Sequence, residues 1–252
     1  MGLIHKFYLG LCTGLVCSVL MTSLVWADPL RVFVAASLGD AVKAITDTWP
    51  QEVVVSVAGS GTIARQVDLG APADVIMLAN LDWMNWLDAR GKIQTDTRAE
   101  PVGNLLVLVG PAGAGPLADV DRATLLARLG STGRIAMGEH RSVPAGQYAA
   151  EWFKSQGLWS VLRPRLAEVD NVRAALALVS RGEVPLAVVY QSDLVVAPDA
   201  ATPVWDIPVH EQPNIRYGVA AVTPKGTDLA RALAAPEAVA TFARFGFLPV
   251  AP

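Results

Sequence analysis

The chain has 252 residues, of which 52 % are hydrophobic and only 17 % are charged. A disordered chain would carry more charge and less apolar surface, so this composition predicts a folded protein. The 20 Lys and Arg residues are balanced by 23 Asp and Glu residues. Without a basic stripe to follow a phosphate backbone, nucleic acid is excluded as a partner.

The long apolar run of the sequence lies at its N-terminus, from Phe7 to Val25, behind the cation Lys6. It closes with Val25-Trp26-Ala27, a small-x-small site, and no cluster of Lys or Arg follows it. This pattern is typical of a secretory signal peptide rather than a transmembrane anchor. We therefore predict a signal peptide over residues 1–27, cleaved after Ala27, and a periplasmic location.

Both cysteines, Cys12 and Cys17, lie inside this segment. The branched Val16 stands where a lipid-attachment site needs a small residue, so a lipid anchor is not expected. Cleavage would remove one Lys and no acid, changing the formal charge from −3 to −4. A negative protein is poorly suited to attract anions over long distances, so any anion site must work through short-range hydrogen bonds.

From Asp28 onward, predicted strands and helices alternate, which favours parallel α/β layers. The predicted strands are 30–36, 52–57, 75–79, 104–109, 134–137, 186–190, 204–207 and 215–222. Apolar residues at helical spacing predict helices over 38–49, 63–67, 81–87, 125–129, 146–156, 172–179, 227–234 and 236–245. Three of the helices follow the N-cap residues Asn80, Asp121 and Asn171.

A Gly- and Pro-rich loop at 110–116 interrupts this alternation, and the pattern then restarts. The sequence therefore predicts two α/β lobes. The first lobe comprises residues 28–108 with 216–252, and the second comprises 109–215. The segments Asn104–Val109 and Ile215–Val222 would cross between the lobes, which would close like a hinge.

Four residues occupy one kind of position, where a strand or loop is followed by a helix: Ser37, Ser60, Ala145 and Val172. A fifth, Tyr190, ends an apolar strand and can direct its hydroxyl the same way. Such positions present backbone N–H groups at the positive end of a helix, and three of the five add a hydroxyl. Neutral donors that meet in one cleft would suit a compact oxyanion. Taken singly, each also has an ordinary explanation as a cap, a turn or a core residue.

The order of the surrounding blocks resembles the periplasmic molybdate-binding proteins of ABC transporters. The blocks are Ala35-Ala36-Ser37-Leu38, Gly59-Ser60-Gly61-Thr62, Gly70-Ala71-Pro72-Ala73-Asp74, Val143-Pro144-Ala145-Gly146-Gln147-Tyr148-Ala149, Asn171-Val172-Arg173-Ala174-Ala175-Leu176 and Val188-Val189-Tyr190-Gln191-Ser192-Asp193. The resemblance extends over essentially all of 28–252. It implies a type II periplasmic binding fold with the ligand cleft between two lobes.

The resemblance also implies a function and a site. Molybdate or tungstate would be held by the hydroxyl and N–H groups of Ser37 and Ser60, the N–H groups of Ala145 and Val172, and the Tyr190 hydroxyl. The expected partner is an inner-membrane ABC permease, and the protein would be a monomer without a cofactor. The main departure is glycine at 59 and 61, where relatives often have serine.

The residues also bear on alternative functions. Another tetrahedral oxyanion, such as sulfate or phosphate, would suit the same donors, and the block around Ala145 together with Tyr190 favours molybdate. A serine hydrolase would need Ser60 with His140 or His210 as base, but Ser60 lacks the outer glycines of a nucleophile elbow. A bare metal cation is not expected, because the acids are scattered without ligand spacing. No phosphate loop with lysine is present.

Overall fold

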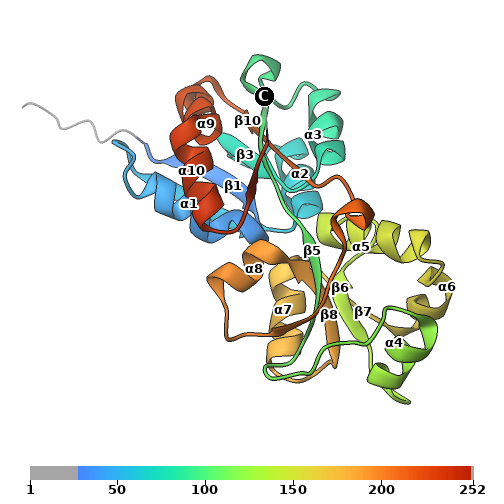
Figure 1. The fold of residues 1–252 in the computed structure, drawn as a ribbon. Helices are drawn as coiled ribbons and strands as arrows, with labels where there is room; N and C mark the ends of the chain where they lie inside the picture. The colour runs from blue at the N-terminus through green and yellow to red at the C-terminus, as the bar shows by residue number, and fades with distance from the viewer. Residues whose placement is uncertain (1–27, 251–252) are drawn as a thin grey trace, which may run out of the picture.

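The computed structural model describes residues 28–250, and the predicted signal peptide lies outside the described residues. The described chain forms two β-sheets, each flanked by helices, stacked end to end as two lobes (Figure 1). The family of folds predicted from the sequence, two α/β lobes, is confirmed. No helix in this part of the chain is long and apolar enough to span a membrane.

The first lobe is built on a six-stranded sheet in the order β11-β4-β10-β3-β1-β2. Its strands are β1 (Leu30–Ala35), β2 (Val53–Ala58), β3 (Val75–Leu78), β4 (Ala99–Gly103), β10 (Arg216–Ala221) and β11 (Leu248–Pro249). Its helices are α1 (Gly39–Thr46), α2 (Ser60–Asp68), α3 (Leu81–Asp88), α9 (Thr227–Ala234) and α10 (Pro236–Arg244). A short 3-10 helix, Ala36–Leu38, joins β1 to α1.

The second lobe is built on a five-stranded sheet in the order β7-β6-β8-β5-β9. Its strands are β5 (Leu106–Gly110), β6 (Ile135–Gly138), β7 (Leu166–Val169), β8 (Leu186–Tyr190) and β9 (Thr202–Asp206). Its helices are α4 (Arg122–Leu129), α5 (Pro144–Ser155), α6 (Trp159–Leu162), α7 (Val172–Ser180) and α8 (Gln191–Val196).

The expectation of parallel sheets is only partly right. β1 pairs in parallel with β2 and β3, and β6 pairs in parallel with β7 and β8. In contrast, β10 is antiparallel to β3 and β4, and β5 is antiparallel to β8 and β9. These two antiparallel strands are the ones that enter each sheet after the chain has come from the other lobe. Both sheets are therefore mixed.

The chain passes from the first sheet to the second between β4 and β5, at Asn104 and Leu105, and returns between β9 and β10 at residues 207–215. The predicted division between 108 and 109 would cut β5, whose five residues all lie in the second sheet. The segment Asn104–Val109, predicted as one crossing strand, is thus divided. Asn104 and Leu105 make the crossing, and the rest belongs to β5. The Gly/Pro loop at 110–116 follows β5 and lies within the second lobe.

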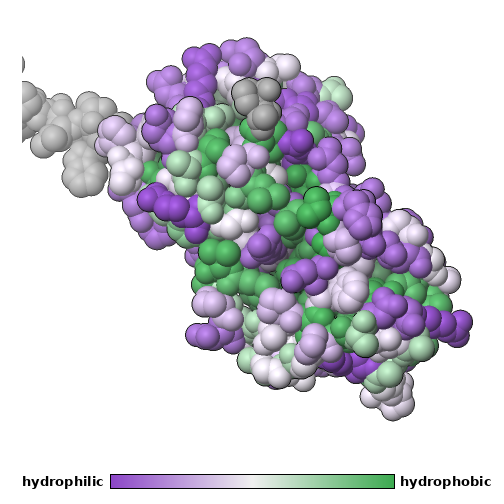
Figure 2. Space-filling view, viewed as in Figure 1, coloured by the Kyte–Doolittle hydropathy of each residue, from purple (hydrophilic) through white to green (hydrophobic). Residues whose placement is uncertain are grey.

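The interior strands β3, β5 and β8 are apolar along almost their whole length, and every residue in them is buried. Helices on the sheet faces account for this burial, as expected for α/β layers. On the surface, hydrophobic and hydrophilic residues are interspersed, and the visible face of neither lobe is of one kind only (Figure 2). Helices α5, α7 and α8 begin beside the first lobe (Figure 1), so the helix starts of the two lobes face one another.

Candidate functional site

A small cavity lies where the two lobes meet. Its lining is Ala35, Ala36, Ser37, Gly59, Ser60, Ala79, Val143, Pro144, Ala145, Asn171, Val172 and Tyr190. All five residues singled out in the sequence are among them. Three segments of the first lobe (35–37, 59–60 and 79) face three of the second (143–145, 171–172 and 190). None of these lining residues has a charged side chain. The cavity volume is about 10 Å³, far below the roughly 300 Å³ at which sites for drug-sized ligands begin.

The first lobe contributes two hydroxyls to this cavity. Ser37 follows β1 in the 3-10 turn and is 2 % exposed, and Ser60 is the first residue of α2 and is 1 % exposed. The Ser60 Oγ accepts a hydrogen bond from the Ala79 N–H at 3.0 Å. The N–H groups of Thr62 and Ile63 both bond to the Gly59 carbonyl. The first N–H groups of α2, at Ser60 and Gly61, have no acceptor within the helix.

The second lobe contributes backbone at two helix starts. In α7, the N-cap Asn171 side chain accepts from the Ala174 N–H at 3.0 Å, and the Val172 N–H has no acceptor within the helix. In α5, Pro144 stands at the first position and has no N–H, so Ala145 supplies the first amide donor. Both helices are at least nine residues long, so each adds the positive end of a helix dipole to the cavity.

Tyr190 ends β8 and is 1 % exposed. Its hydroxyl has no hydrogen-bond partner among the described residues. Burial raises the pKa of this phenol well above its ordinary value, so the hydroxyl stays protonated and available as a donor. A buried polar group without a partner costs about 1–3 kcal/mol. The Tyr190 hydroxyl therefore indicates a ligand acceptor in the cavity.

A buried ion pair between Asp193 and Arg173 contacts the backbone of Tyr190. Asp193 is fully buried, accepts from the Tyr190 N–H at 2.9 Å and lies 2.6 Å from the Arg173 Nε. Burial raises the pKa of Asp193 to about 6, although the Arg173 charge opposes the shift. Arg173 also reaches across the lobes to the Asp40 carboxylate, at 3.1 Å. The first-turn residue beside Val172 thus links both lobes.

Further contacts hold the lobes together around the cavity. The Trp83 Nε1 donates to the Ser142 carbonyl at 3.0 Å, and the Asn80 Nδ2 donates to the Gln147 Oε1 at 3.1 Å.

Gly59 and Gly61 are part of the same closure. A Cβ at Gly59 would lie 2.3 Å from the Asp170 carbonyl oxygen, and one at Gly61 would lie 2.5 Å from the Ser142 oxygen. Any side chain at either position would separate the lobes. The two glycines are therefore explained by close approach of the second lobe.

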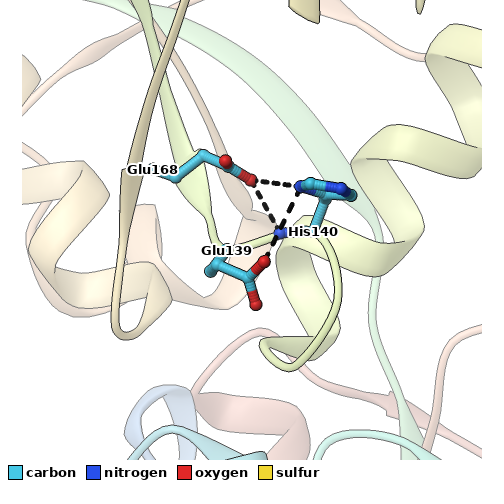
Figure 3. Close-up of side chains that lie close together, drawn as sticks. All are labelled: Glu139, His140 and Glu168. Carbon is cyan, nitrogen blue, oxygen red and sulfur yellow. Dashed lines mark hydrogen bonds and ion pairs between the residues drawn. The ribbon is translucent and has the colours of Figure 1, made fainter.

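The expectation of scattered acids is wrong at one place in the second lobe. Ligand atoms of Glu139, His140 and Glu168 lie within 4.8 Å of one another (Figure 3). They are already engaged: the His140 Nδ1 pairs with Glu168 at 2.5 Å, and Glu139 accepts from Arg141 and Ser142 at 2.7 and 2.8 Å. Burial raises the pKa of Glu139, but these two bonds outweigh it and hold that pKa below its ordinary value. The cluster braces the loop before α5.

The geometry also bears on the hydrolase alternative. Ser60 Oγ is hydrogen-bonded to the Ala79 N–H, and the His140 ring is paired with Glu168. The other histidine considered as a base, His210, has a side chain 82 % exposed. Neither imidazole is a hydrogen-bond partner of Ser60, so the arrangement that would activate a serine nucleophile is not formed among the described residues.

Two side chains behind the cavity are not among the residues singled out from the sequence. Tyr217 hydrogen-bonds to Ser37 at 3.0 Å and Asn104 to Tyr217 at 3.1 Å, and both are buried. Asn104 could have been suspected, because it is a polar residue that directly precedes an apolar strand. Tyr217 lies 180 positions from Ser37, and nothing local in the sequence connects them.

Comparisons with known proteins agree with this geometry. Residues 30–248 match the family of bacterial extracellular solute-binding proteins. The molybdate-binding protein ModA of Escherichia coli (strain K12) is 38 % identical over 251 residues, covering 95 % of this chain and 97 % of that protein.

Two solved structures share the fold. The periplasmic molybdate-binding protein of Azotobacter vinelandii has a TM-score of 0.74 at 21 % identity, covering 88 % of this chain and 99 % of that one. The sulfate-binding protein SubI of Mycobacterium tuberculosis H37Rv has a TM-score of 0.68 at 16 % identity, covering 89 % and 88 %. The fold alone thus does not select the anion. The match over 30–248 and the ModA relative together place the chain: it belongs to the bacterial extracellular solute-binding protein family.

Proposed function

We propose that this protein binds molybdate or tungstate between its lobes and delivers it to an ABC importer. The observation that carries the proposal is the Tyr190 hydroxyl, a buried donor with no partner among residues 28–250, in a small cavity lined by further donors. The 38 % identity to a molybdate-binding protein over nearly the whole chain supports the choice of anion.

The chemistry of the lining favours an anion that only accepts hydrogen bonds. Ser37, Ser60 and Tyr190 offer hydroxyls, and the starts of α2, α5 and α7 offer N–H groups. Hydrogen bonds to an ionised acceptor are roughly twice as strong as neutral ones. A dianion can therefore be held without a cationic side chain in the cavity lining.

Size supplies the preference among tetrahedral oxyanions. Donors on both lobes surround this small cavity, and the contacts across Gly59 and Gly61 limit how much further the lobes can approach. A larger oxyanion reaches donors on both sides at once. A smaller one such as sulfate leaves a buried donor unpaired, at a cost of about 1–3 kcal/mol for each one.

The remaining parts of the proposal concern cellular context. We propose export to the periplasm after cleavage at Ala27, a monomeric state, and handover to an inner-membrane permease. We also propose a binding role rather than an enzymatic one, with no resident cofactor and no bare metal ion. Opening about Asn104–Leu105 and residues 207–215 would let the ligand enter and leave, since these are the two places where the chain changes sheets.

Calorimetric titration of the processed chain with molybdate, tungstate, sulfate and phosphate in parallel tests this function. Molybdate and tungstate are expected to bind with saturation. At a hundredfold excess over Kd, either should add about 2.7 kcal/mol to the free energy of unfolding. Sulfate or phosphate binding as tightly as molybdate would contradict the size argument. Absence of binding by molybdate and tungstate would contradict the proposed function.

A further inference from the structure

A chain of four buried polar side chains runs from the cavity to the crossing between the lobes. The Ser37 Oγ lies 3.0 Å from the Tyr217 Oη, and the Asn104 Nδ2 lies 3.1 Å from that same Oη. The Asn104 Nδ2 also donates to the Ser192 Oγ at 2.8 Å. All four side chains are at most 3 % exposed. Each polar hydrogen atom in this chain therefore needs an acceptor within the network or in the cavity.

The orientation of the Asn104 amide is set by backbone. Its Oδ1 accepts from the Leu105 N–H at 2.9 Å and faces the Ser192 N–H at 3.5 Å. Because a backbone N–H can only donate, the oxygen of the amide must be on that side. The Nδ2 group then directs its two hydrogens to Ser192 and Tyr217.

This orientation decides the direction of the next bond. The Tyr217 Oη already accepts from Asn104, and burial raises the pKa of Tyr217 above its ordinary value, so the phenol keeps its proton. If Ser37 also donated to the Tyr217 Oη, the buried Tyr217 hydrogen would have no acceptor within hydrogen-bond distance among the described residues, which is unfavourable. The Tyr217 O–H therefore donates to Ser37, and the hydrogen of Ser37 remains to point into the cavity.

We propose that Tyr217 and Asn104 are positioning residues that hold the Ser37 hydroxyl as a donor toward a bound oxyanion. The proposal rests on the proposed function and deepens it, because it assigns an orientation to one of the ligand donors. Ser60 is set in the same way by a different partner, since its Oγ accepts from the Ala79 N–H. Both serines are thus turned into donors before the ligand arrives.

This chain of four hydrogen-bonded side chains, here called the relay, also connects the two lobes. Ser37 and Tyr217 lie in the first lobe, Asn104 lies at the crossing, and Ser192 lies in α8 of the second lobe. Asn104 takes its orientation from residues next to it and in the second lobe. A change at the crossing would therefore reach the cavity through two hydrogen bonds.

A double-mutant cycle measured by molybdate calorimetry tests the relay. The proteins are the unaltered processed chain, Ser37→Ala, Tyr217→Phe and the double variant. Tyr217→Phe is expected to weaken binding about fivefold, the worth of one hydrogen bond. In the Ser37→Ala background the same change is expected to cost nothing further, because the hydroxyl that it orients is gone. A merely structural role of Tyr217 would give the same loss in both backgrounds.

Thr97→Val is the matched control. Thr97 is also a buried hydroxyl bonded to β10, through the Ala221 N–H at 2.9 Å, but it does not line the cavity. Its substitution is expected to lower the melting temperature and leave molybdate affinity unchanged. Asn104→Asp provides a second variant, since a carboxylate would accept from Tyr217 and turn Ser37 away from the cavity. Its effect on affinity should likewise shrink when Ser37 is alanine.

The outcomes separate the relay from the proposed function. Unchanged binding by Tyr217→Phe, or equal losses in both backgrounds, would overturn the relay while molybdate binding by the unaltered chain stood. If the unaltered chain bound sulfate but not molybdate, the proposed function would fail, and the same cycle run with sulfate would decide the relay. Binding of none of molybdate, tungstate and sulfate would overturn both.

Discussion

The two sides of the cavity use different parts of the chain for the same task. The first lobe contributes the serine hydroxyls of Ser37 and Ser60, each of which already has a protein partner. The second lobe contributes backbone amides at Ala145 and Val172, and the Tyr190 hydroxyl, which has no hydrogen-bond partner in the described part of the chain. We therefore expect side-chain identity to matter for binding at three of the five positions. At the other two, we expect the helix start to matter and the side chain mainly to pack.

The largest effect is expected where the lobes touch. Gly59→Ala and Gly61→Ala each place a Cβ within 2.5 Å of a carbonyl oxygen of the opposite lobe. Backbone cannot move aside as a side chain can, so closure should be incomplete. We expect a loss of about 3 kcal/mol in molybdate binding, over a hundredfold, measured by calorimetry.

Gly115→Ala is the control for this pair, because nothing lies within 4 Å of its added Cβ. It should bind as the unaltered chain does. A Gly61→Ala variant with unchanged affinity would show that the lobes do not need to approach this closely.

Removing a hydroxyl should change the melting temperature of the ligand-free protein in opposite directions in the two lobes. Ser60→Ala and Tyr190→Phe should each weaken molybdate binding by about 1–3 kcal/mol. Ser60→Ala also removes the acceptor of the Ala79 N–H, so the ligand-free protein should melt lower. Tyr190→Phe removes a buried hydroxyl for which the described residues provide no partner, so the ligand-free protein should melt at the same temperature or higher. Equal shifts of melting temperature in both variants would argue against this division.

The buried carboxyl of Asp193 in the second lobe should make the free energy of unfolding depend on pH. The pKa of Asp193 is about 6 in the folded chain, against an ordinary value of 3.8. Between these values the folded chain holds a proton that the unfolded chain has lost. The free energy of unfolding contributed by Asp193 should therefore fall as pH rises from about 4 to 6, on the order of 2 kcal/mol.

Denaturant unfolding of the unaltered chain and of Asp193→Asn across this range measures the difference. Asparagine retains an acceptor for the Tyr190 N–H and does not titrate. If the gap between the two proteins stays constant with pH, then Asp193 is ionised throughout.

The smallest effect on affinity is expected at Val172. The side chain is 3 % exposed and the predicted donor is its backbone N–H. Val172→Ala should lower the free energy of unfolding by about 1–2 kcal/mol and leave molybdate affinity within about twofold. A tenfold loss of affinity without a loss of stability would assign the side chain, not the amide, to the ligand.

Elements with strong local signals could be predicted from the sequence. The apolar strands β1, β3 and β8 were predicted, and the N-caps Asn80, Asp121 and Asn171 are confirmed, since each accepts from the backbone N–H three residues on. β4 was missed, because Pro101 and Glu100 obscure its pattern. β7 was missed because it has only four residues directly after an Arg-Pro-Arg turn.

In the site too, features local in the sequence could be predicted, and contacts between distant residues could not. Helix starts are local features, and all five candidate residues line the cavity. The supporting contacts are not local: Ser37 with Tyr217, Asn104 with Ser192, and His140 with Glu168 join positions 180, 88 and 28 residues apart. Periodicity and spacing carry no record of such pairings. Ser37 meets Tyr217 only because the chain returns to the first sheet after its second crossing.

The uncharged lining described above also has a consequence for how the cargo leaves. An anion clamped by lysine or arginine has to be separated from a countercharge, and that separation is slow in a dry cavity. Here every donor that faces the cavity is a neutral dipole, which water can serve equally well once the lobes part. The barrier to unloading is then the opening motion itself. A transporter that pulls the two lobes apart would need no chemical step and no competing ion to empty the site.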